Sequence, residues 1–452
     1  MIIFTVNLII ISLIFIPSCF AYIDPGTGGY LISSIFSFIL GFFALVLGIV
    51  LRFFRHTLKN FILKIWKKQR IFFIFSCIVI VFLFLFSIYF FFFNLQDKYE
   101  LPSYDVSKNG VQYYDTTKVF DGYNLYEGKL IDMNGKLIKN WNFKYLSILD
   151  KNGNYYAQES YESLKWGKFT WDDKPIWIKK LPIHHEIYIT PENTIFTFTK
   201  EVHEYNRRKV EFDVIVEFSS EGKTLQKWST WENLNELKKF HKPLELDTTQ
   251  KISPTHKKNT SIWGGNYDYY HLNSFSLVPH NSMEKVHKAF TPGNWIISFR
   301  HGSMIFILDK DSKKVLWSGI YDQIKDNIEG QHSVKMLPDG NLIIFDNGRY
   351  REWSRIIKLN PVNMKILWEY KKKDFYSMSQ GYIQLLENGN MLITDSEIGR
   401  VFELDKNKNI VWEFYNPEFI SKIDENKTIR DDIYRMYRYD KKFIDEIIKK
   451  KN

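Results

Sequence analysis

The strongest constraint on this chain is a repeated unit, made of an apolar strand, a polar turn and a second strand that ends in tryptophan. Six copies occur, ending at Trp141, Trp177, Trp228, Trp317, Trp368 and Trp412. Another strand–turn–strand unit precedes most of them, as in YLSILDKNGNYYA and QHSVKMLPDGNLIIF. Together the two units give four strands per repeat, with Trp-to-Trp spacings of 36, 51, 89, 51 and 44 residues. Repeats of four short strands at about this period predict a β-propeller.

We therefore predict an all-β fold, a six-bladed β-propeller over residues 110–430, with seven blades as the alternative count. An insertion at 230–270 explains the longest spacing. The first copy has no clear preceding unit, so strands from both ends of the propeller are expected to complete that blade. Residues 431–452 are expected to form a basic helical tail.

The N-terminal residues differ in composition from the propeller. Two uncharged hydrophobic segments, at about 31–51 and 71–93, are each long enough to span a bilayer as a helix. Residues 1–21 end in SCFA and form either a signal peptide or a first transmembrane helix. We predict two or three N-terminal transmembrane helices, with residues 22–98 as the membrane anchor.

The formal net charge of +10 is concentrated in one place. Seven of the positive charges lie in the loop 52–70, which contains no acidic residue. A basic loop between hydrophobic segments indicates a cytoplasmic loop rather than a nucleic-acid site. We therefore expect a multi-pass protein of the bacterial inner membrane, with its C-terminal domain facing the periplasm or exterior and no nucleic-acid partner. The two cysteines, Cys19 and Cys77, lie in hydrophobic segments, so the exported part has no thiol nucleophile.

Three histidines are predicted to meet at one end of the propeller channel, because the first strand of each blade lines that channel. His185 and His332 each precede the proline of the next turn by six residues, and His271 precedes its proline by eight. An offset of two residues keeps a side chain on the same face of a strand. Arg300, in GNWIISFRHG, is placed at the same end. The histidines without this spacing are interpreted as surface or loop residues: His184, His203, His280, His287 and His301.

The segments HHEI, HLNS, SFRHGSMIFILD and QHSVKMLPDGNLIIFDNG, in this order, resemble motifs of the bacterial arylsulfotransferase family. DGYNLYEGKLIDMNGKLIKNW and IYRMYRYDKKF are similar to its first blade and its C-terminal tail, so the resemblance covers about 110–445. It implies nucleotide-independent transfer of a sulfuryl group from an aryl sulfate to a phenolic or other hydroxyl acceptor. No cofactor and no metal are implied. The resemblance assigns His332 as the transiently sulfated nucleophile and His185, His271 and Arg300 as the groups around the sulfate. We further predict that Asn273, Tyr382 and Asn347 bind the substrate.

The chemistry of sulfuryl transfer agrees with these residue types. A neutral imidazole can attack the shielded sulfur and leave again, which divides one difficult transfer into two steps. The planar guanidinium of Arg300 suits the sulfuryl oxygens. His185 and His271 can donate to those oxygens or protonate the leaving phenolate. The predicted mechanism is therefore ping-pong.

The same residues also permit other interpretations of the site. Three convergent histidines could hold Zn²⁺ or Cu²⁺, although the fixed charge of Arg300 disfavours a metal. A non-catalytic envelope propeller that binds a glycan or a protein partner is a second alternative. A quinone-dependent dehydrogenase is more distant, because no acidic cluster for calcium is evident. The family also commonly lacks membrane segments, so the predicted anchor is a departure from its pattern.

Overall fold

The structure is a computed structural model that describes residues 107–161, 163–246, 261–319, 327–422 and 427–451, and the isolated residues 60, 63 and 79. The chain divides into two compact units, Met1–Ser103 and Tyr104–Asn452. The predicted segment 1–21, the helices at about 31–51 and 71–93 and the loop 52–70 lie, apart from those three residues, outside the described part. No helix within the described residues is both long and apolar enough to cross a bilayer.

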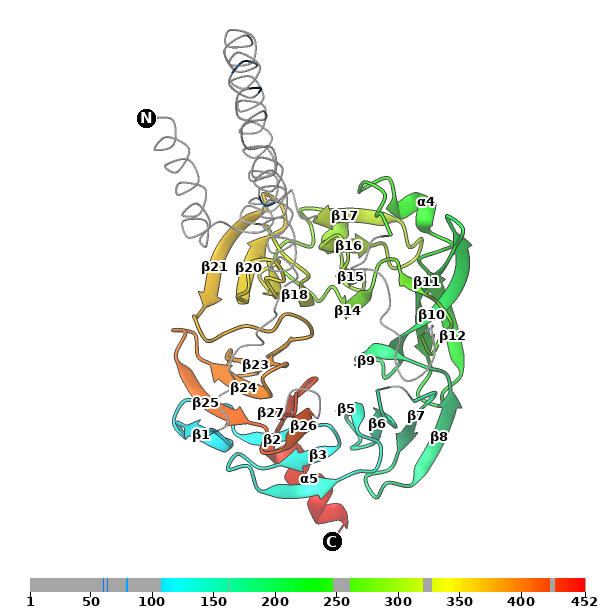
Figure 1. Cartoon of the computed structure of the whole chain (residues 1–452). Helices are drawn as coiled ribbons and strands as arrows, with labels where there is room; N and C mark the ends of the chain where they lie inside the picture. Colours follow the sequence, from blue (N-terminus) through cyan, green and yellow to red (C-terminus); the bar gives the residue numbers. More distant parts are fainter. Residues whose placement is uncertain are drawn as a thin grey trace. The chain divides into compact units, whose positions relative to one another are not determined.

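Six sheets, each built on four antiparallel strands, surround a central axis in the second unit, which confirms the six-bladed propeller (Figure 1). From the axis outward, blade 1 consists of β28 (Tyr437–Asp440), β2 (Gly122–Tyr126), β3 (Lys129–Ile131) and β4 (Leu137–Asn140). Blade 2 consists of β5 (Tyr145–Leu149), β6 (Tyr155–Gln158), β7 (Lys165–Phe169) and β8 (Pro175–Lys180). Blade 3 consists of β9 (His184–Ile189), β10 (Ile195–Tyr205), β11 (Arg208–Phe218) and β12 (Thr224–Ser229).

The second half of the ring repeats this pattern. Blade 4 consists of β14 (Leu272–Leu277), β15 (Trp295–Phe299), β16 (Met304–Leu308) and β17 (Val315–Gly319). Blade 5 consists of β18 (His332–Met336), β19 (Leu342–Asp346), β20 (Arg355–Asn360) and β21 (Lys365–Lys371). Blade 6 consists of β22 (Tyr382–Leu385), β23 (Met391–Asp395), β24 (Arg400–Leu404), β25 (Ile410–Tyr415) and an additional outer strand, β1 (Gly110–Tyr114).

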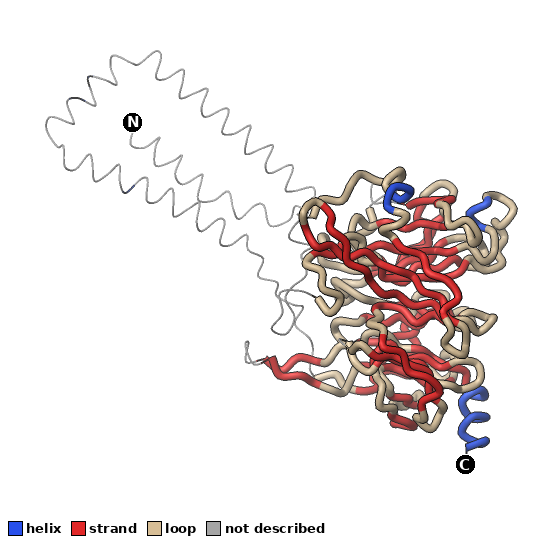
Figure 2. Tube along the Cα trace, turned by 90° about the vertical axis from the view of Figure 1, so that its right-hand side faces the viewer, coloured by secondary structure: helices blue, strands red, loops and turns tan. Residues whose placement is uncertain are grey.

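A few elements lie outside the blade pattern. These are α4 (Leu234–Leu237), β13 (Tyr267–Asp268), which pairs in parallel with β11, the 3₁₀ helix η2 (Lys288–Phe290), the hairpin β26 (Phe419–Lys422) and β27 (Lys427–Arg430), and α5 (Lys441–Lys451). Figure 2 shows how strands and loops dominate the described residues, with α5 at the C-terminal end.

Strands from both ends of the propeller close the ring. The C-terminal β28 is the innermost strand of blade 1, as predicted for the incomplete first repeat, and the N-terminal β1 extends blade 6. The propeller therefore continues past residue 430, where the sequence placed its end, and the helical tail is α5 alone. Arg438 of β28 forms a fully buried ion pair with Glu403 of β24, which joins blade 1 to blade 6.

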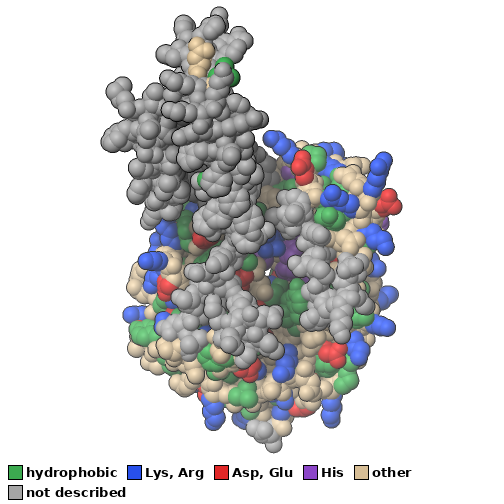
Figure 3. Space-filling model, in the orientation of Figure 1, with side chains coloured by type: hydrophobic (Ala, Val, Ile, Leu, Met, Phe, Trp, Pro, Cys, Tyr) green, Lys and Arg blue, Asp and Glu red, His purple; other side chains and the backbone are tan. Residues whose placement is uncertain are grey.

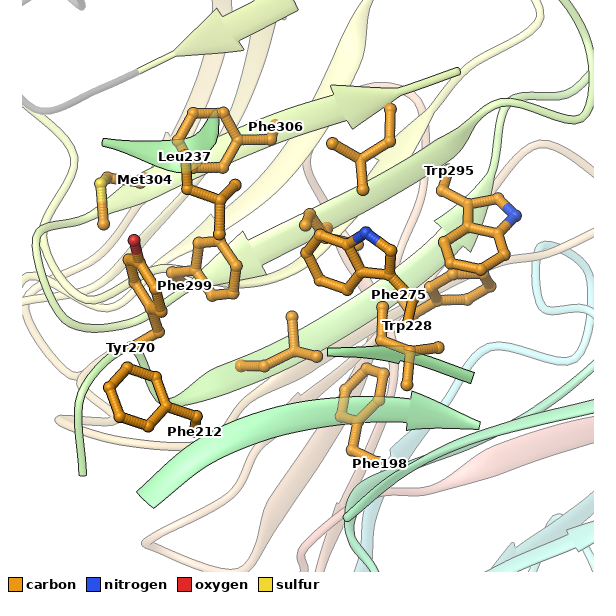
Figure 4. Close-up of a cluster of buried hydrophobic side chains, with 14 of the residues drawn as sticks. Phe198, Phe212, Trp228, Leu237, Tyr270, Phe275, Trp295, Phe299, Met304 and Phe306 are labelled. Carbon is orange, nitrogen blue, oxygen red and sulfur yellow. The ribbon is translucent and has the colours of Figure 1, made fainter. Parts of the chain in front are cut away.

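Hydrophobic clusters fill the spaces between neighbouring blades, one for each of the six junctions. Figure 4 shows the cluster between blades 3 and 4, where Phe198 and Phe212 pack opposite Phe275, Trp295 and Phe299. A sheet with apolar side chains on both faces must be covered on both sides, and a ring of blades provides this cover without a free end. The alternation of apolar strands in the sequence therefore has its cause in face-to-face packing.

The repeated tryptophans pack between blades, and several donate a hydrogen bond to the following blade. The indole Nε1 of Trp177 donates to Ser220 O at 3.1 Å, that of Trp317 to Pro361 O at 2.8 Å and that of Trp412 to Met133 O at 2.9 Å. Each acceptor lies in or beside the turn between the third and fourth strands of the next blade. The tryptophans therefore recur once per blade because each one contacts the neighbouring blade.

Candidate functional site

His185, His271 and His332 meet at the channel axis, as the sequence predicted. They lie at the starts of β9, β14 and β18, three strands that face the middle of the ring in Figure 1. The ring centroid of His185 lies 4.7 Å from that of His271 and 6.2 Å from that of His332. Histidine side chains are visible in the central hollow of Figure 3. One site therefore collects side chains from three consecutive blades.

Irregular backbone at the start of each inner strand aims these side chains. His185 and His271 have φ angles of 59° and 58°, in the left-handed region, and Ser333, beside His332, has a φ of 48°. The pairing register shifts at the same points in blades 3, 4 and 5. Such bulges redirect side chains and are frequent beside active sites. The histidines converge because of these bulges, and not simply because of strand alternation counted from the prolines.

The contacts of His332 define its tautomer. Its Nδ1 lies 3.0 Å from Gly330 O and 2.8 Å from Asn347 Oδ1. The amide nitrogen of Asn347 donates to Ser377 O and Gln380 O, which fixes the amide oxygen toward the histidine. Because both neighbours of Nδ1 are acceptors, Nδ1 carries the hydrogen and Nε2 keeps its lone pair. Nε2 is therefore the atom available for reaction.

The surroundings of His332 keep the ring neutral. The residue is 3% exposed, and burial lowers the pKa of its imidazole to about 3, with the positive charge of Arg300 acting in the same direction. The hydrogen bond with Asn347 opposes this shift but does not cancel it. A neutral imidazole with a free Nε2 is the form in which histidine acts as a nucleophile.

Arg300 supplies the positive charge of the site. Its backbone N–H donates to His271 O at 3.0 Å, which places the residue beside that histidine. Among the described residues, the buried Nε of Arg300 has no hydrogen-bond partner. Burial, and then the neighbouring Arg349, lower the pKa of the guanidinium to about 10, so Arg300 stays charged at neutral pH. A charged guanidinium with a buried, unpartnered donor favours an anionic ligand.

A carboxylate that the sequence analysis missed lies behind His271. Nδ1 of His271 donates to Asp268 Oδ2 at 2.6 Å, and Lys200 Nζ lies 2.6 Å from the same oxygen. Lys200 and His271 hold the pKa of Asp268 well below its usual range, despite its burial. Burial holds the pKa of His271 well below its usual value, although the Asp268 carboxylate acts in the opposite direction. The Nδ1–H of His271 is therefore fixed, and its Nε2 remains available.

His184 and His301 belong to this centre, which corrects their interpretation as surface or loop residues. Each is 6% exposed. Nδ1 of His184 lies 2.8 Å from Nδ1 of His185, and the ring of His301 lies 5.3 Å from that of His271. His280, by contrast, has a side chain that is 91% exposed. Adjacency in HHEI was the signal for His184 that the spacing argument overlooked.

The three predicted substrate-binding residues have different surroundings. Asn347 orients His332. Asn273 is buried and its amide nitrogen donates to Gln331 O at 2.7 Å, while its Oδ1 has no partner among the described residues. The ring of Tyr382 lies 4.0 Å from Lys335 Nζ and 4.1 Å from the guanidinium carbon of Arg435.

Arg435 comes from the C-terminal segment and was not identified from the sequence. It pairs with the buried Glu186, and its Nη2 donates to His185 O at 3.1 Å. Its charge also lowers the pKa of His332. The IYRMYRYD segment therefore contributes to the site as well as to blade 1, because it leads directly into β28.

No group of three or more His, Cys, Asp or Glu residues within the described ranges is arranged to hold a metal ion. The three histidines instead have separate partners, namely Asn347, Asp268 and His184.

A family model described as arylsulfotransferase (ASST) matches residues 128–417. No curated protein matches the chain. Among solved structures, similarity is found to a protein of unknown function from Bacteroides caccae (13% identity, TM-score 0.41, covering 65% of this chain and 93% of that one). A streptogramin B lyase is similar at 10% identity with a TM-score of 0.37, covering 73% of this chain and 97% of that one. Virginiamycin B lyase from Staphylococcus aureus is similar at 11% identity with a TM-score of 0.32, covering 68% of this chain and 88% of that one.

Proposed function

Because this chain belongs to the arylsulfotransferase family, we propose that it moves a sulfuryl group from an aryl sulfate ester to a phenolic or other hydroxyl acceptor through a sulfated His332. The observation that carries this proposal is the state of His332, which is neutral, nearly buried and fixed with its hydrogen on Nδ1. Nε2 is the attacking atom. No nucleotide takes part.

The reaction proceeds in two steps. Nε2 of His332 attacks sulfur, the bond from sulfur to the aryl oxygen breaks, and the departing phenolate takes a proton from His185. The acceptor then enters the same place, its hydroxyl returns a proton to His185 as its oxygen attacks sulfur, and neutral imidazole is released. A covalent intermediate of this kind divides one high barrier into two lower ones and produces ping-pong kinetics.

Arg300 and the two other histidines bind the sulfuryl group. The guanidinium of Arg300 donates to sulfuryl oxygens from a buried position, where the interaction is stronger than in water. A bound sulfate ester adds a negative charge next to His271, whose other side already faces Asp268. Two anions favour the protonated form of His271, so that its Nε2–H donates to a sulfuryl oxygen. His185, whose ring centroid lies 4.7 Å from that of His271, exchanges a proton with the aryl oxygen.

We also propose that the enzyme is anchored in the bacterial inner membrane by the hydrophobic segments at about 31–51 and 71–93, with the propeller on the outer side. The uncharged composition of both segments and the basic loop 52–70 support this placement. An acceptor associated with the membrane or the envelope would fit such an anchor.

The decisive experiment is sulfuryl transfer from p-nitrophenyl sulfate to phenol, measured for the wild type and for His332→Ala. The wild type should release p-nitrophenolate, form phenyl sulfate and carry an acid-labile sulfuryl group on His332 in the absence of acceptor. His332→Ala should lose all three. His280→Ala is the matched control, since that histidine is exposed. Turnover that survives in His332→Ala would exclude His332 as the nucleophile, and ligand binding without turnover in the wild type would favour the non-catalytic propeller.

A further inference from the structure

We propose that His184 and Asp213 form a proton relay behind His185, which supplies a proton to the leaving phenolate and takes one back from the acceptor. The inference rests on the proposed function and adds two positioning residues to it. Neither residue is required for attack on sulfur, so the relay can be tested separately from the nucleophile.

The three residues form a line from the channel into the interior of blade 3. Nδ1 of His185 lies 2.8 Å from Nδ1 of His184, and Nε2 of His184 lies 3.4 Å from Asp213 Oδ1. His184 is 6% exposed and Asp213 is fully buried. Neither His184 Nε2 nor Asp213 Oδ1 has a hydrogen-bond partner among the described residues. The 3.4 Å separation is long for a hydrogen bond, and such contacts often shorten only when substrate is bound.

Two Nδ1 atoms at 2.8 Å must share one hydrogen, and this couples the tautomers of the two rings. When Asp213 is protonated and donates to His184, the hydrogen of His184 lies on Nδ1, and His185 carries its hydrogen on Nε2. When Asp213 is ionised, His184 donates to it from Nε2, and Nε2 of His185 is a bare lone pair. One arrangement makes His185 an acid toward the channel and the other makes it a base.

The surroundings of Asp213 make both its protonated and its ionised forms accessible, so the two hydrogen-bond arrangements can interconvert. Burial, and then the charge of Asp268, raise the pKa of Asp213 to about 7, so both of its protonation states are accessible near neutral pH. The charged or titratable groups that face it are His184 from β9, Lys200 from β10, Glu211 from β11 itself, Asp268 from β13 and Tyr270 just after β13. The remaining oxygen of Asp213 accepts from Leu272 N at 3.0 Å, which holds the carboxyl in place.

The proton balance of the two half-reactions matches this relay. In the first, the leaving phenolate takes the hydrogen from Nε2 of His185, which takes one on Nδ1 from His184. His184 in turn takes the hydrogen of Asp213 on Nε2. The products are a neutral phenol, a sulfated His332 that is neutral overall, and ionised Asp213, which now holds the charge of the donor. In the second half-reaction the hydroxyl hydrogen of the acceptor returns by the same path.

His271 has no equivalent relay, which explains why the two arms of the site differ. Its partner Asp268 is held ionised by Lys200 at 2.6 Å, so it stores no proton near neutral pH. Asp213 has no lysine within ion-pairing distance among the described residues. The arm through His271 therefore fixes a tautomer, whereas the arm through His185 moves a proton.

The test compares wild type and Asp213→Asn. The rate of His332 sulfation in a single turnover is measured by rapid quenching and mass spectrometry. Two donors are compared: p-nitrophenyl sulfate, whose leaving group is stable as an anion, and phenyl sulfate, whose leaving group needs a proton. We expect a loss on the order of 100-fold with phenyl sulfate, the usual scale of general acid catalysis, and less than about 3-fold with p-nitrophenyl sulfate. His184→Gln should show the same dependence on the donor.

Glu217→Gln is the matched control, because Glu217 is a carboxylate of the same strand that accepts from Thr194 Oγ1 and Gln226 Nε2 and contacts neither His184 nor Asp213. It should leave the ratio of the two rates unchanged. In the wild type the phenyl sulfate rate should fall as the pH rises through about 7, because Asp213 loses its proton, and Asp213→Asn should lack this fall.

The outcomes separate the two proposals. Equal losses with both donors, in a variant whose thermal unfolding matches that of the wild type, would overturn the relay and leave the sulfohistidine intact. Absence of any sulfated His332 in the wild type would overturn the proposed function itself.

Discussion

At the scale of single residues, the site depends on which nitrogen of each histidine carries a hydrogen. Asn347 decides this for His332, because its amide oxygen accepts at 2.8 Å while its amide nitrogen is held by two carbonyl groups. A neutral amide in this place fixes the tautomer without adding the negative charge that a carboxylate would bring. The imidazole therefore stays both oriented and uncharged.

Replacing Asn347 by alanine should separate orientation from stability. We expect Asn347→Ala to slow His332 sulfation on the order of 100-fold, because the ring can turn and the wrong tautomer becomes available. Asn294→Ala removes another buried amide, one that contacts Lys288 O, Ala289 O and Lys310 N and lies outside the site. Both variants should lose about 1–3 kcal/mol of unfolding free energy. Only Asn347→Ala should slow the sulfation of His332. Similar rates for the two variants would contradict this role.

Burial of neutral His332 should also make stability depend on pH. Its pKa is about 3 in the folded protein and about 6.5 in the unfolded chain, so only the unfolded chain takes up a proton as the pH falls below about 6.5. Stability is therefore lost as the pH falls through the unfolded pKa. Between about pH 7.5 and pH 5.5 the wild type should lose about 1.4 kcal/mol more than His332→Asn in urea unfolding. Parallel pH profiles for the two proteins would argue against a neutral, buried His332.

At the scale of elements, loops and bulges at one end of the blades position the site, while the strands provide the frame. The DNG sequence, which begins at the last residue of β19, shows this, because Asn347 must reach back to His332 from a tight turn. Gly348 has a φ of 68°, and a methyl group there would lie 1.9 Å from Trp353 O. Only glycine fits this turn without moving the backbone.

Gly348→Ala should therefore disturb both the fold and the reaction. We expect a loss of more than about 2 kcal/mol in unfolding free energy, because a positive φ and a backbone clash act together. Gly110→Ala is the matched control, since Gly110 has a φ of 67° with nothing within 4 Å of the added methyl group. It should cost about 1 kcal/mol and leave sulfation of His332 unchanged. Equal costs at the two positions would show that the turn can adapt.

The C-terminal strand should determine whether the ring closes. A chain that ends at Arg430 lacks β28 and the buried Arg438–Glu403 pair, and it leaves the core of blade 1 without its inner strand. We expect this chain to lose cooperative thermal unfolding. A chain that ends at Asp440 lacks only α5, which buries Ile444, and it should unfold cooperatively at a lower temperature. Cooperative unfolding of the shorter chain, followed by circular dichroism, would contradict closure by β28.

At the scale of the whole molecule, the six junctions between blades make the propeller one cooperative unit with a polar axis. Each junction has its own apolar cluster, and the tryptophan N–H groups reach across several of them. Charged groups collect instead at the channel, where Arg300, Arg435, Lys200 and Asp268 surround the histidines. Burying these charged groups costs folding free energy. The ring can bear this cost because the apolar clusters that stabilise it lie between the blades, away from the channel.

The proposed anchor predicts how the full chain behaves in cells. The full chain should remain in the membrane fraction after alkaline carbonate extraction, because two segments of about 20 residues insert as helices. A chain that begins at Tyr104, the start of the second compact unit, should be released. Protease added to spheroplasts should cleave the propeller and spare a tag inserted in the loop 52–70. Release of the full chain by carbonate would rule out the anchor.

The sequence alone determined the four-stranded repeat, and it predicted six blades with seven as the alternative, completion of the first blade by terminal strands, and a shared end of the channel for His185, His271, His332 and Arg300. These follow from short-range patterns, since strand alternation, turn residues and a fixed period all act within one blade. Only the tertiary structure decided which groups stand behind the histidines. Asp213 and Lys200 are distant in sequence from His184 and Asp268, which they contact, and Asp268 lies three residues from His271 but on a separate strand. Asp213 does interrupt the apolar run VEFDVIVEF, but its partner is set by how blade 3 folds. Proton position and charge depend on contacts across strands, and no local pattern in the sequence encodes those contacts.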